Sequence, residues 1–266
     1  MVKKVLFIIN PISGIGRQKT IETLLPKVLD KNQISYDIIY TSYKRHAESI
    51  AKENAAKYSI IVAVGGDGTV NEVASGLYGS NCAMAVIPTG SGNGLARFLK
   101  IPLQLTKAIK LIETGKSQMI DTVFCNDKLF VNVGGVGFDA EIGHRFAESK
   151  TRGLITYARI TLNELKYFTA RKFSLKVNDQ ISEENALLIS FANSNQWGNN
   201  VKIAPLADIT DGKVEICILR KIPILKAPFV AIKLFSGSIH KSKYLKIIST
   251  DEIEISSDEI PLKYHI

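Results

Sequence analysis

Residues 58–79 read YSIIVAVGGDGTVNEVASGLYG. An apolar, β-branched run ends at Val64, two glycines follow, and a helical pattern begins within a few residues. This succession predicts a strand, a tight glycine turn and a helix. Glycine lets backbone N–H groups approach a ligand, and the start of a helix carries a partial positive charge that suits phosphate. Asp67 would repel phosphate directly, so we expect it to act through a divalent cation. The stretch therefore predicts a site for a nucleotide triphosphate with Mg²⁺.

The same stretch also has a purely structural interpretation. Thr69 and Glu72 have the spacing of a capping box, in which two side chains close the start of a helix. A strand-to-helix turn usually needs one glycine, whereas here three glycines flank a carboxylate. We therefore favour the phosphate site over the simple turn.

Strand and helix signals alternate through the first half of the chain. Strands are expected over residues 4–9, 35–40, 60–64 and 84–87, and helices over residues 17–30 and 45–57. This alternation predicts an α/β fold with a doubly wound parallel sheet covered by helices on both faces. Ligands bind beyond the carboxyl ends of strands in such sheets. Three glycine-bearing loops follow predicted strands, at residues 10–14, 65–69 and 88–94, so we expect them to build one site.

Beyond Asp121 the pattern changes to short alternating runs separated by Asn, Asp and Gly. These runs lie at residues 129–133, 173–177, 186–191, 214–219 and 252–255, and they predict an antiparallel, β-rich second domain over residues 122–266 after an α/β domain over residues 1–121. Helical spacing appears at residues 154–168 and 222–235. The second of these segments, IPILKAPFVAIKLF, is strongly apolar but contains Lys226 and Lys233. It is either a core helix or an apolar, basic surface that faces a membrane.

The chain carries 34 Lys and Arg residues against 25 Asp and Glu, a formal net charge of +9. This surplus favours an acidic partner such as a nucleic acid, an anionic membrane or a polyphosphate, although a basic surface can also serve solubility alone. The basic residues are dispersed and lack the aromatic interleaving of nucleic-acid-binding modules, so we expect no nucleic-acid partner. Cys82, Cys125 and Cys217 are isolated, which is typical of a reducing cytosol. No segment reaches transmembrane length, and we expect a cytoplasmic protein.

These motifs resemble those of the diacylglycerol kinase catalytic-domain family, which includes sphingosine kinases and bacterial soluble lipid kinases. The resemblance covers essentially the whole chain. It rests on NPISG at residues 10–14, GGDGTVNE at 65–72, PTGSGNGLAR at 88–97, Asp121, FVNVGGVGFD at 130–139 and APLADITDG at 204–212. NAD kinases share the GGDGT loop, whereas the loop at residues 88–97 and the Asp-x-x-Asp-Gly segment favour lipid kinases.

The resemblance implies a two-domain kinase that uses ATP and Mg²⁺ to phosphorylate a diacylglycerol or sphingoid-like lipid at an anionic membrane surface, with its active site between the domains. Asp67 would anchor the catalytic Mg²⁺ through water, with Asp121 in the same network; a simple helix or strand cap is the alternative for Asp121. Asp208 and Asp211, with the backbone carbonyl of Lys213, match the structural Mg²⁺ site of bacterial members, although Asp-x-x-Asp-Gly is also a common hairpin turn. The residues that would line the ATP site are Asn10, Pro11, Ile12, Ser13, Gly14, Thr41, Gly65, Gly66, Asp67, Gly68, Thr69, Val70, Asn71, Glu72, Gly90, Ser91 and Asn93.

The chain departs from the family pattern in two places. Gly94 stands where many members have Asp, a feature that sphingosine-kinase-like members share. The Asp-Gly-Glu triplet whose Asp resembles a general base is absent, and Asp258 and Glu259 lie before the closing strand. We therefore expect the triplet to follow Ile266 and the C-terminal end to be incomplete. An NAD kinase and a catalytically inactive nucleotide-binding regulator are the alternatives, and a homodimer through an exposed edge strand stays open.

Overall fold

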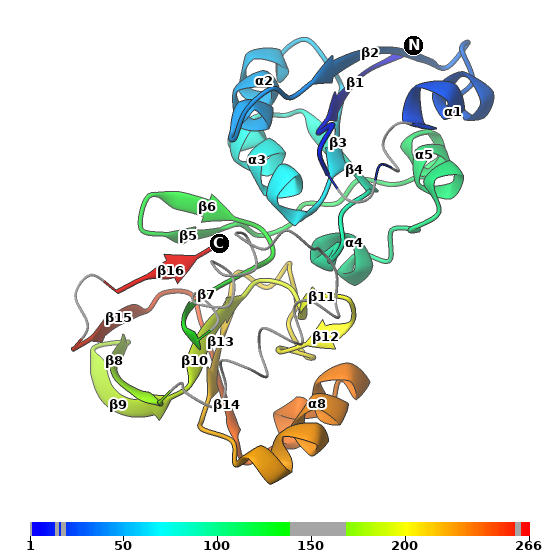
Figure 1. Cartoon of the computed structure of the whole chain (residues 1–266). Coiled ribbons are helices and arrows are strands. Elements are labelled where there is room, and N and C mark those ends of the chain that lie inside the picture. Colours follow the sequence, from blue (N-terminus) through cyan, green and yellow to red (C-terminus); the bar gives the residue numbers. More distant parts are fainter. Residues whose placement is uncertain (1, 14–15, 17–19, 139–168, 259–261) are drawn as a thin grey trace. The chain divides into compact units, whose positions relative to one another are not determined.

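The computed structural model describes residues 2–13, 16, 20–138, 169–258 and 262–266 (Figure 1). The helix predicted over residues 154–168 lies outside these described residues. The chain divides into two compact units, unit 1 (Met1–Met119) and unit 2 (Ile120–Ile266). The sequence predicts this boundary two residues later, after Asp121.

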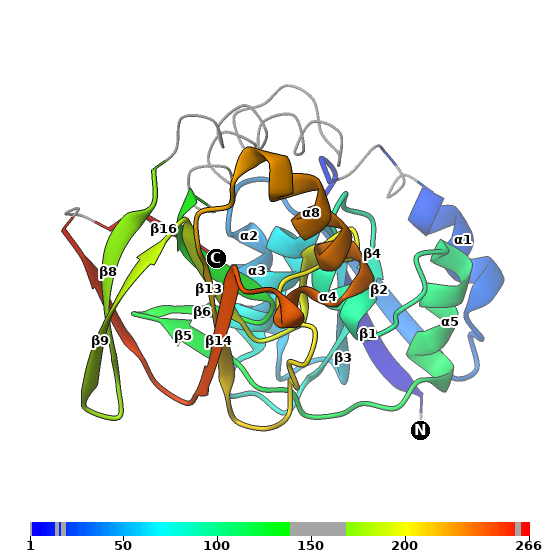
Figure 2. The ribbon, with the colours of Figure 1, turned by 90° about the horizontal axis from the view of Figure 1, so that it is seen from below.

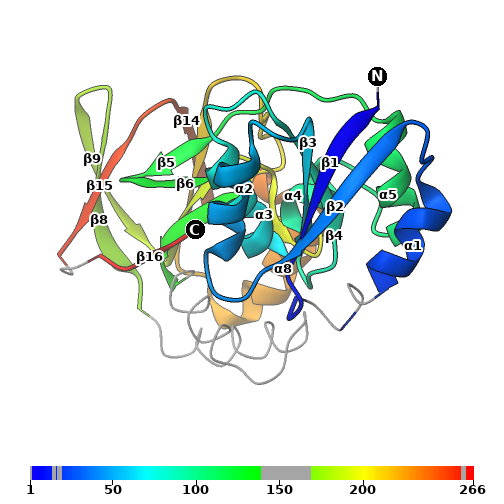
Figure 3. The same cartoon turned by 90° about the horizontal axis from the view of Figure 1, so that it is seen from above.

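Unit 1 is built on a parallel sheet in the strand order β2-β1-β3-β4 (Figure 3). The strands are β1 Lys3–Ile9, β2 Ile34–Tyr40, β3 Ile60–Gly65 and β4 Ala83–Pro88. Val5 to Ile9 are fully buried, as expected for a parallel strand that is covered on both faces. Ile9 pairs with Tyr40 on one side and Val64 on the other, and Gly65 pairs with Pro88, so the four carboxyl ends lie at one edge of the sheet.

Helices cover both faces of this sheet, and the doubly wound prediction is confirmed. The helices are α1 Ile21–Val28, α2 His46–Asn54, α3 Asp67–Leu77, α4 Gly94–Phe98 and α5 Leu105–Thr114. α1 and α5 pack with Val5, Phe7 and Ile9, which point to the same face. α2 and α3 lie on the opposite side (Figure 3). Among the described residues, the first two helices are shorter than predicted, since α1 begins at Ile21 and α2 ends at Asn54.

Unit 2 is rich in antiparallel strands, as predicted (Figures 1 and 2). A five-stranded sheet has the order β14-β13-β10-β7-β16, and a three-stranded sheet has the order β15-β8-β9. Two hairpins, β5-β6 and β11-β12, accompany them. The strand bounds are β5 Val123–Cys125, β6 Lys128–Phe130, β7 Val133–Gly137, β8 Arg171–Val177, β9 Gln180–Ala186, β10 Leu188–Ala192, β11 Gln196–Gly198, β12 Val201–Lys202, β13 Val214–Leu219, β14 Leu245–Thr250, β15 Glu254–Ser257 and β16 Tyr264–His265.

Four segments of unit 2 differ from the prediction. The strand expected over residues 186–191 spans two strands, because β9 ends at Ala186 and β10 begins at Leu188. The strand expected over residues 129–133 is two strands, because the chain turns at Asn132, whose carbonyl accepts the N–H groups of Asn193 and Ser194. The strand expected over residues 252–255 begins two residues later, at Glu254. Residues 222–235 form a short 3₁₀ turn, η2 Ile224–Lys226, and the helix α8 Ala227–Ser236, and most of their apolar side chains are exposed. A fully buried core helix is therefore the wrong interpretation of this segment.

Cys82, Cys125 and Cys217 are all free thiols, and burial strongly raises the pKa of Cys217. In the described part of the chain, no helix is both long and apolar enough to cross a membrane.

Candidate functional site

The loops that follow β1, β3 and β4 are joined at the carboxyl edge of the unit 1 sheet. The N–H group of Asn10 donates to the carbonyl of Val64 at 3.0 Å. The carbonyl of Gly65 accepts from the N–H groups of both Thr89 and Gly90, at 3.0 and 3.2 Å. The structure therefore brings together the three glycine-bearing loops that the sequence predicts to meet.

Two of these loops touch backbone to backbone. A Cβ atom added to Gly90 would lie 2.4 Å from the Cα atom of Gly66, and one added to Gly66 would lie 3.2 Å from the Cα atom of Gly90. A real side chain at residue 90 cannot come so close to a neighbouring backbone atom. The sequence predicts that these glycines allow a ligand to approach, and the structure adds the approach of another loop as a reason for them.

Polar side chains from the same loops form one network. The Asn10 side-chain amide donates to Thr69 Oγ1 at 3.0 Å, and its Oδ1 accepts the N–H group of Ile12 at 3.1 Å. The Ser13 hydroxyl donates to the Asn10 carbonyl at 3.0 Å and shares a buried 2.9 Å hydrogen bond with the Thr89 hydroxyl. Thr89 was not predicted as a site residue, although its place in the PTGSGNG loop was a signal for it. These bonds fix the orientation of an amide and three hydroxyls beside the glycine loops.

Asp67 lies where β3 gives way to α3, and its carboxylate faces the start of α4. Its Oδ1 accepts the N–H group of Gly94 at 2.7 Å. Burial raises the pKa of the Asp67 carboxyl above its usual range, and the N–H groups of Gly94, Asn93, Leu95 and Asp67 itself oppose this effect less strongly. Gly94, the residue that departs from the family pattern, thus supplies a hydrogen bond to Asp67. A cation beside this carboxylate would favour its ionised form.

The start of α3 does not have the predicted capping box. The helix begins at Asp67 with Gly66 at its N-cap, so Thr69 is buried inside the helix. The N–H group of Val70 bonds to the Gly66 carbonyl at 3.0 Å, which leaves the N–H groups of the three preceding residues outside the helical ladder. Such groups at the start of an 11-residue helix suit an anion.

Glu72 acts at a different helix from the one that the capping box implied. Its carboxylate accepts the N–H groups of Arg45 and Ala47 at 3.0 and 3.3 Å, at the start of α2. Arg45 has a left-handed backbone, with φ of 66°, so the chain turns sharply there into the helix. Glu72 therefore caps α2 from a neighbouring helix, and an added role at the ATP site stays a prediction.

The remaining residues of the predicted ATP site also lie at this edge. The N–H group of Thr41 donates to the Ile9 carbonyl at 2.9 Å directly after β2. Asn93 has a left-handed backbone, and its side-chain amide donates to the Gly90 carbonyl at 2.7 Å, which closes the loop that contains Ser91. Val70 is buried, so only its backbone could face a ligand. Gly14 lies outside the described residues.

Asp121 belongs to unit 2, where a turn and a buried amide hold it. Its Oδ2 accepts the N–H group of Gly212 at 2.7 Å, and its own N–H group donates to the Ile209 carbonyl at 2.7 Å. The side-chain amide of Asn193, which is fully buried, donates to the carbonyls of Asp121 and Val131 at 2.9 and 3.0 Å. Asp121 is thus tied to the turn at residues 208–213. A network that it shares with Asp67, which lies in the other unit, stays a prediction.

The turn at residues 208–213 contains the two carboxylates of the predicted metal site, and each accepts hydrogen bonds from the turn itself. Asp208 Oδ1 accepts the N–H and hydroxyl groups of Thr210 at 3.0 and 2.7 Å, and Asp211 Oδ1 accepts the N–H group of Lys213 at 2.9 Å. These are the bonds of aspartate-stabilised turns. Within the described ranges, no group of three or more His, Cys, Asp or Glu side chains is placed to hold a metal ion. Turn hydrogen bonds engage one oxygen of each carboxylate, but β12 and β13 on either side of the turn do not pair as a hairpin. A Mg²⁺ there stays a prediction.

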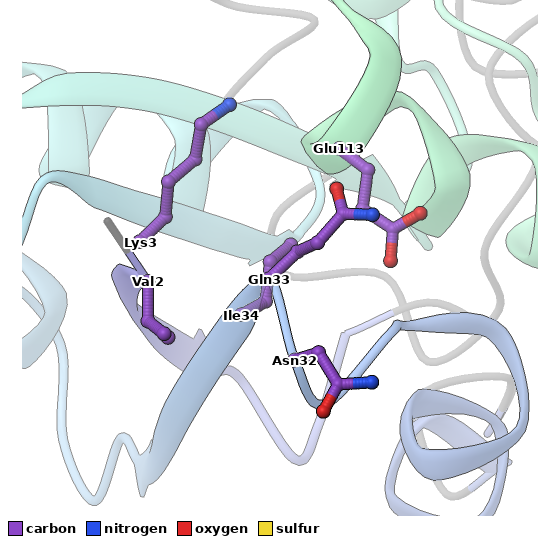
Figure 4. A pocket seen from close by; sticks show the side chains of 6 residues that line it. All are labelled: Val2, Lys3, Asn32, Gln33, Ile34 and Glu113. Atoms are coloured by element: carbon purple, nitrogen blue, oxygen red, sulfur yellow. The ribbon is translucent and has the colours of Figure 1, made fainter.

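A cavity of about 330 Å³ in unit 1 lies at the opposite edge of the sheet (Figure 4). Its lining residues are Val2, Lys3, Asn32, Gln33, Ile34 and Glu113. β1 and β2 begin there, so none of the glycine loops reaches it. The Glu113 carboxylate is engaged by Lys110 and by the N–H group of Asp30. We therefore place the functional site at the carboxyl edge.

Comparison with known proteins identifies the family of the chain. Residues 4–125 match the family described as "Diacylglycerol kinase catalytic domain", and residues 132–265 match that described as "YegS C-terminal NAD kinase beta sandwich-like domain". The chain belongs to the diacylglycerol kinase catalytic-domain family. The glycine loops of unit 1 thus lie in the part that matches the catalytic domain of this family.

Individual members of the family resemble the chain over most of its length. It is 30% identical to a "Probable lipid kinase YegS-like" of Yersinia enterocolitica, with 83% of this chain and 76% of the relative covered. It is 27% identical to a "Diacylglycerol kinase" of Bacillus subtilis, with 97% and 87% covered. The crystal structure of a diacylglycerol kinase from Bacillus anthracis has a TM-score of 0.71 at 23% identity, with 97% and 87% covered, which shows the shared fold.

Proposed function

We propose that the protein is a lipid kinase that uses ATP and Mg²⁺ to phosphorylate a lipid hydroxyl, with diacylglycerol as the first acceptor to test. One observation carries the proposal. The loop after β4 contacts the loop after β3 at Gly66 and Gly90, beside the start of α3, so backbone N–H groups gather where a phosphate chain would bind. The printed names of the relatives supply the lipid part of the proposal.

The residues of unit 1 would bind and orient the triphosphate. The N–H groups at the start of α3 offer hydrogen bonds without adding negative charge, and the Asn10 side chain is held in place by Thr69 and Ile12. Asp67 is the residue that would hold Mg²⁺, since an oxygen ligand suits this hard cation and a cation would stabilise a carboxylate whose pKa burial has raised. When bound, Mg²⁺ would neutralise phosphate charge during transfer.

The reaction forms a bond between the lipid oxygen and the γ-phosphorus and breaks the bond between that phosphorus and ADP, while the hydroxyl proton leaves. Such transfers depend mainly on positioning and on stabilisation of charge. The two joined loops would meet the first requirement, because the hydrogen bonds from Thr89 and Gly90 to the Gly65 carbonyl hold them together. Asp67, through the Mg²⁺ that it would hold, and the N–H groups at the start of α3 would stabilise the charge.

The test is transfer of labelled γ-phosphate from ATP, using the full-length protein. Diacylglycerol in mixed micelles, a total lipid extract and NAD are offered as separate acceptors, each with and without Mg²⁺. A Mg²⁺-dependent lipid product is expected. It should be reduced by Asp67→Asn but not by Asp127→Asn, the same change at an exposed position in the β5-β6 turn.

The other outcomes would replace the proposal. Phosphorylated NAD without a lipid product would identify an NAD kinase. ATP binding with no transfer to any acceptor would identify a regulator without catalysis.

A further inference from the structure

The helix α8 and the turn η2 before it expose five large apolar side chains. Their exposed fractions are 60% for Ile224, 85% for Leu225, 63% for Phe229, 64% for Ile232 and 47% for Phe235. We call these five residues the α8 face. A soluble protein seldom exposes so many large apolar groups together unless they meet a partner.

The α8 face is one side of a helix whose other side is anchored in unit 2. Val230 is buried in the core, and Ala227 and Leu234 pack against that core at a spacing of three and four residues. Phe229 and Ile232 lie between them in sequence and point the other way. α8 (orange in Figure 1) lies against β12, within unit 2 itself. The face is therefore exposed because the opposite side of the same helix already fills the core.

The chain around the α8 face is purely basic. Residues 216–250 contain no Asp or Glu, and they carry seven of the 34 Lys and Arg residues of the chain. Arg220 and Lys246 pair with Glu184. The other five are lysines, at residues 221, 226, 233, 241 and 243. The Nζ atom of Lys226 lies 5.7 Å from the ring of Phe229, so positive charge directly adjoins the apolar surface.

We propose that the α8 face docks the protein on the surface of an anionic lipid bilayer. Large apolar side chains beside lysines fit the boundary between acyl chains and negative headgroups, where each kind of group finds its own environment. A second copy of this chain fits less well, because a symmetric contact would bring together the lysines of a segment that contains no Asp or Glu. The proposal rests on the proposed function in so far as a lipid substrate places the enzyme at a bilayer.

The first test measures partitioning onto vesicles in the absence of ATP. Wild-type protein should bind vesicles of phosphatidylglycerol and phosphatidylcholine more tightly than vesicles of phosphatidylcholine alone, and the difference should shrink as salt is raised. The double variant Phe229→Glu with Ile232→Glu should lower the partition coefficient at least about tenfold. Ile181→Glu is the matched control, because Ile181 is 70% exposed on β9 and lies outside the face, and it should change binding less than about twofold.

The charge contribution is tested separately. Lys226→Gln with Lys233→Gln should weaken binding to the anionic vesicles by about fivefold for each lysine. The control pair is Lys31→Gln with Lys107→Gln, which changes two exposed lysines of unit 1 and should leave binding unchanged. Thermal unfolding of every variant should match wild type, which excludes misfolding as the cause.

A kinase assay separates this proposal from the proposed function. Variants of the α8 face should keep wild-type activity on a short-chain, water-soluble diacylglycerol and lose it on diacylglycerol in vesicles. Activity that is absent on both substrates in wild-type protein would overturn the kinase, whereas unchanged vesicle binding by the Glu variant would overturn the docking face alone. Sedimentation that shows a wild-type dimer dissociated by the Glu variant would assign the face to a second copy instead.

Discussion

The contact between Gly66 and Gly90 makes the strongest prediction about the candidate site. Replacing Gly90 with Ala would place a Cβ atom 2.4 Å from Gly66 Cα, whereas ordinary contact begins at 3.4 Å, so the two loops must separate by about 1 Å. Gly90 does not have a positive φ, so the new side chain meets no backbone penalty and the effect is one of space alone. Overpacking of this kind costs about 1–3 kcal/mol of unfolding free energy. A shift of about 1 Å in a catalytic loop can lower turnover about 10²-fold.

Two measurements test the Gly90→Ala variant. Thermal unfolding reports the loss of stability, and hydrogen exchange reports the N–H groups of Thr89 and Gly90, which both donate to Gly65 and should lose protection as the loops part. Gly68→Ala is the matched control, because a Cβ at this exposed position in α3 meets nothing within 4 Å. In a helix, Ala is favoured over Gly by up to about 1 kcal/mol, so the control should be at least as stable as wild type. A Gly90→Ala protein that matches the control in stability and exchange would refute the reasoning.

Three further predictions concern single side chains. Asp67→Asn should lower turnover by roughly 10²-fold. The same change should raise the unfolding midpoint at neutral pH in metal-free buffer. Burial raises the pKa of the Asp67 carboxyl, so its charged form is unfavourable in the folded protein, and Asn carries no charge. That gain should fade as pH falls through the raised folded-state pKa of Asp67 and vanish below the ordinary Asp pKa of about 3.9, where the group is neutral both folded and unfolded. A gain independent of pH would contradict the assignment. Glu72→Ala should lower the unfolding free energy in urea by about 1 kcal/mol because α2 loses its cap, whereas unchanged stability with weaker ATP binding would place Glu72 at the nucleotide instead. Asn193→Ala should cost about 2–4 kcal/mol in the same measurement, since the buried carbonyl of Val131 and the part-buried carbonyl of Asp121 each lose a donor, and a loss below about 1 kcal/mol would contradict this role.

The two aspartates predicted as catalytic illustrate how far sequence reasoning reaches. The GGDGT motif correctly placed Asp67 after a buried parallel strand and at a helix start, because strand period and glycine turns are local properties of the chain. Its partner Gly94 lies 27 residues later, in another loop. Asp121 is bonded to Gly212, which lies 91 residues later, and no local pattern encodes that pairing.

The sequence by itself determined the fold class, the edge of the sheet where the loops gather, and the family. The short apolar run from Val5 to Ile9, which ends at Asn10-Pro11, predicts a strand buried on both faces, as is typical of a parallel sheet, and the structure confirms it. Only the tertiary structure showed that Glu72 caps α2 and that the α8 face is exposed. An apolar residue is compatible with the core and with a docking surface alike. The space left by neighbouring elements decides between them, and here Val230 fills that space while Phe229 does not.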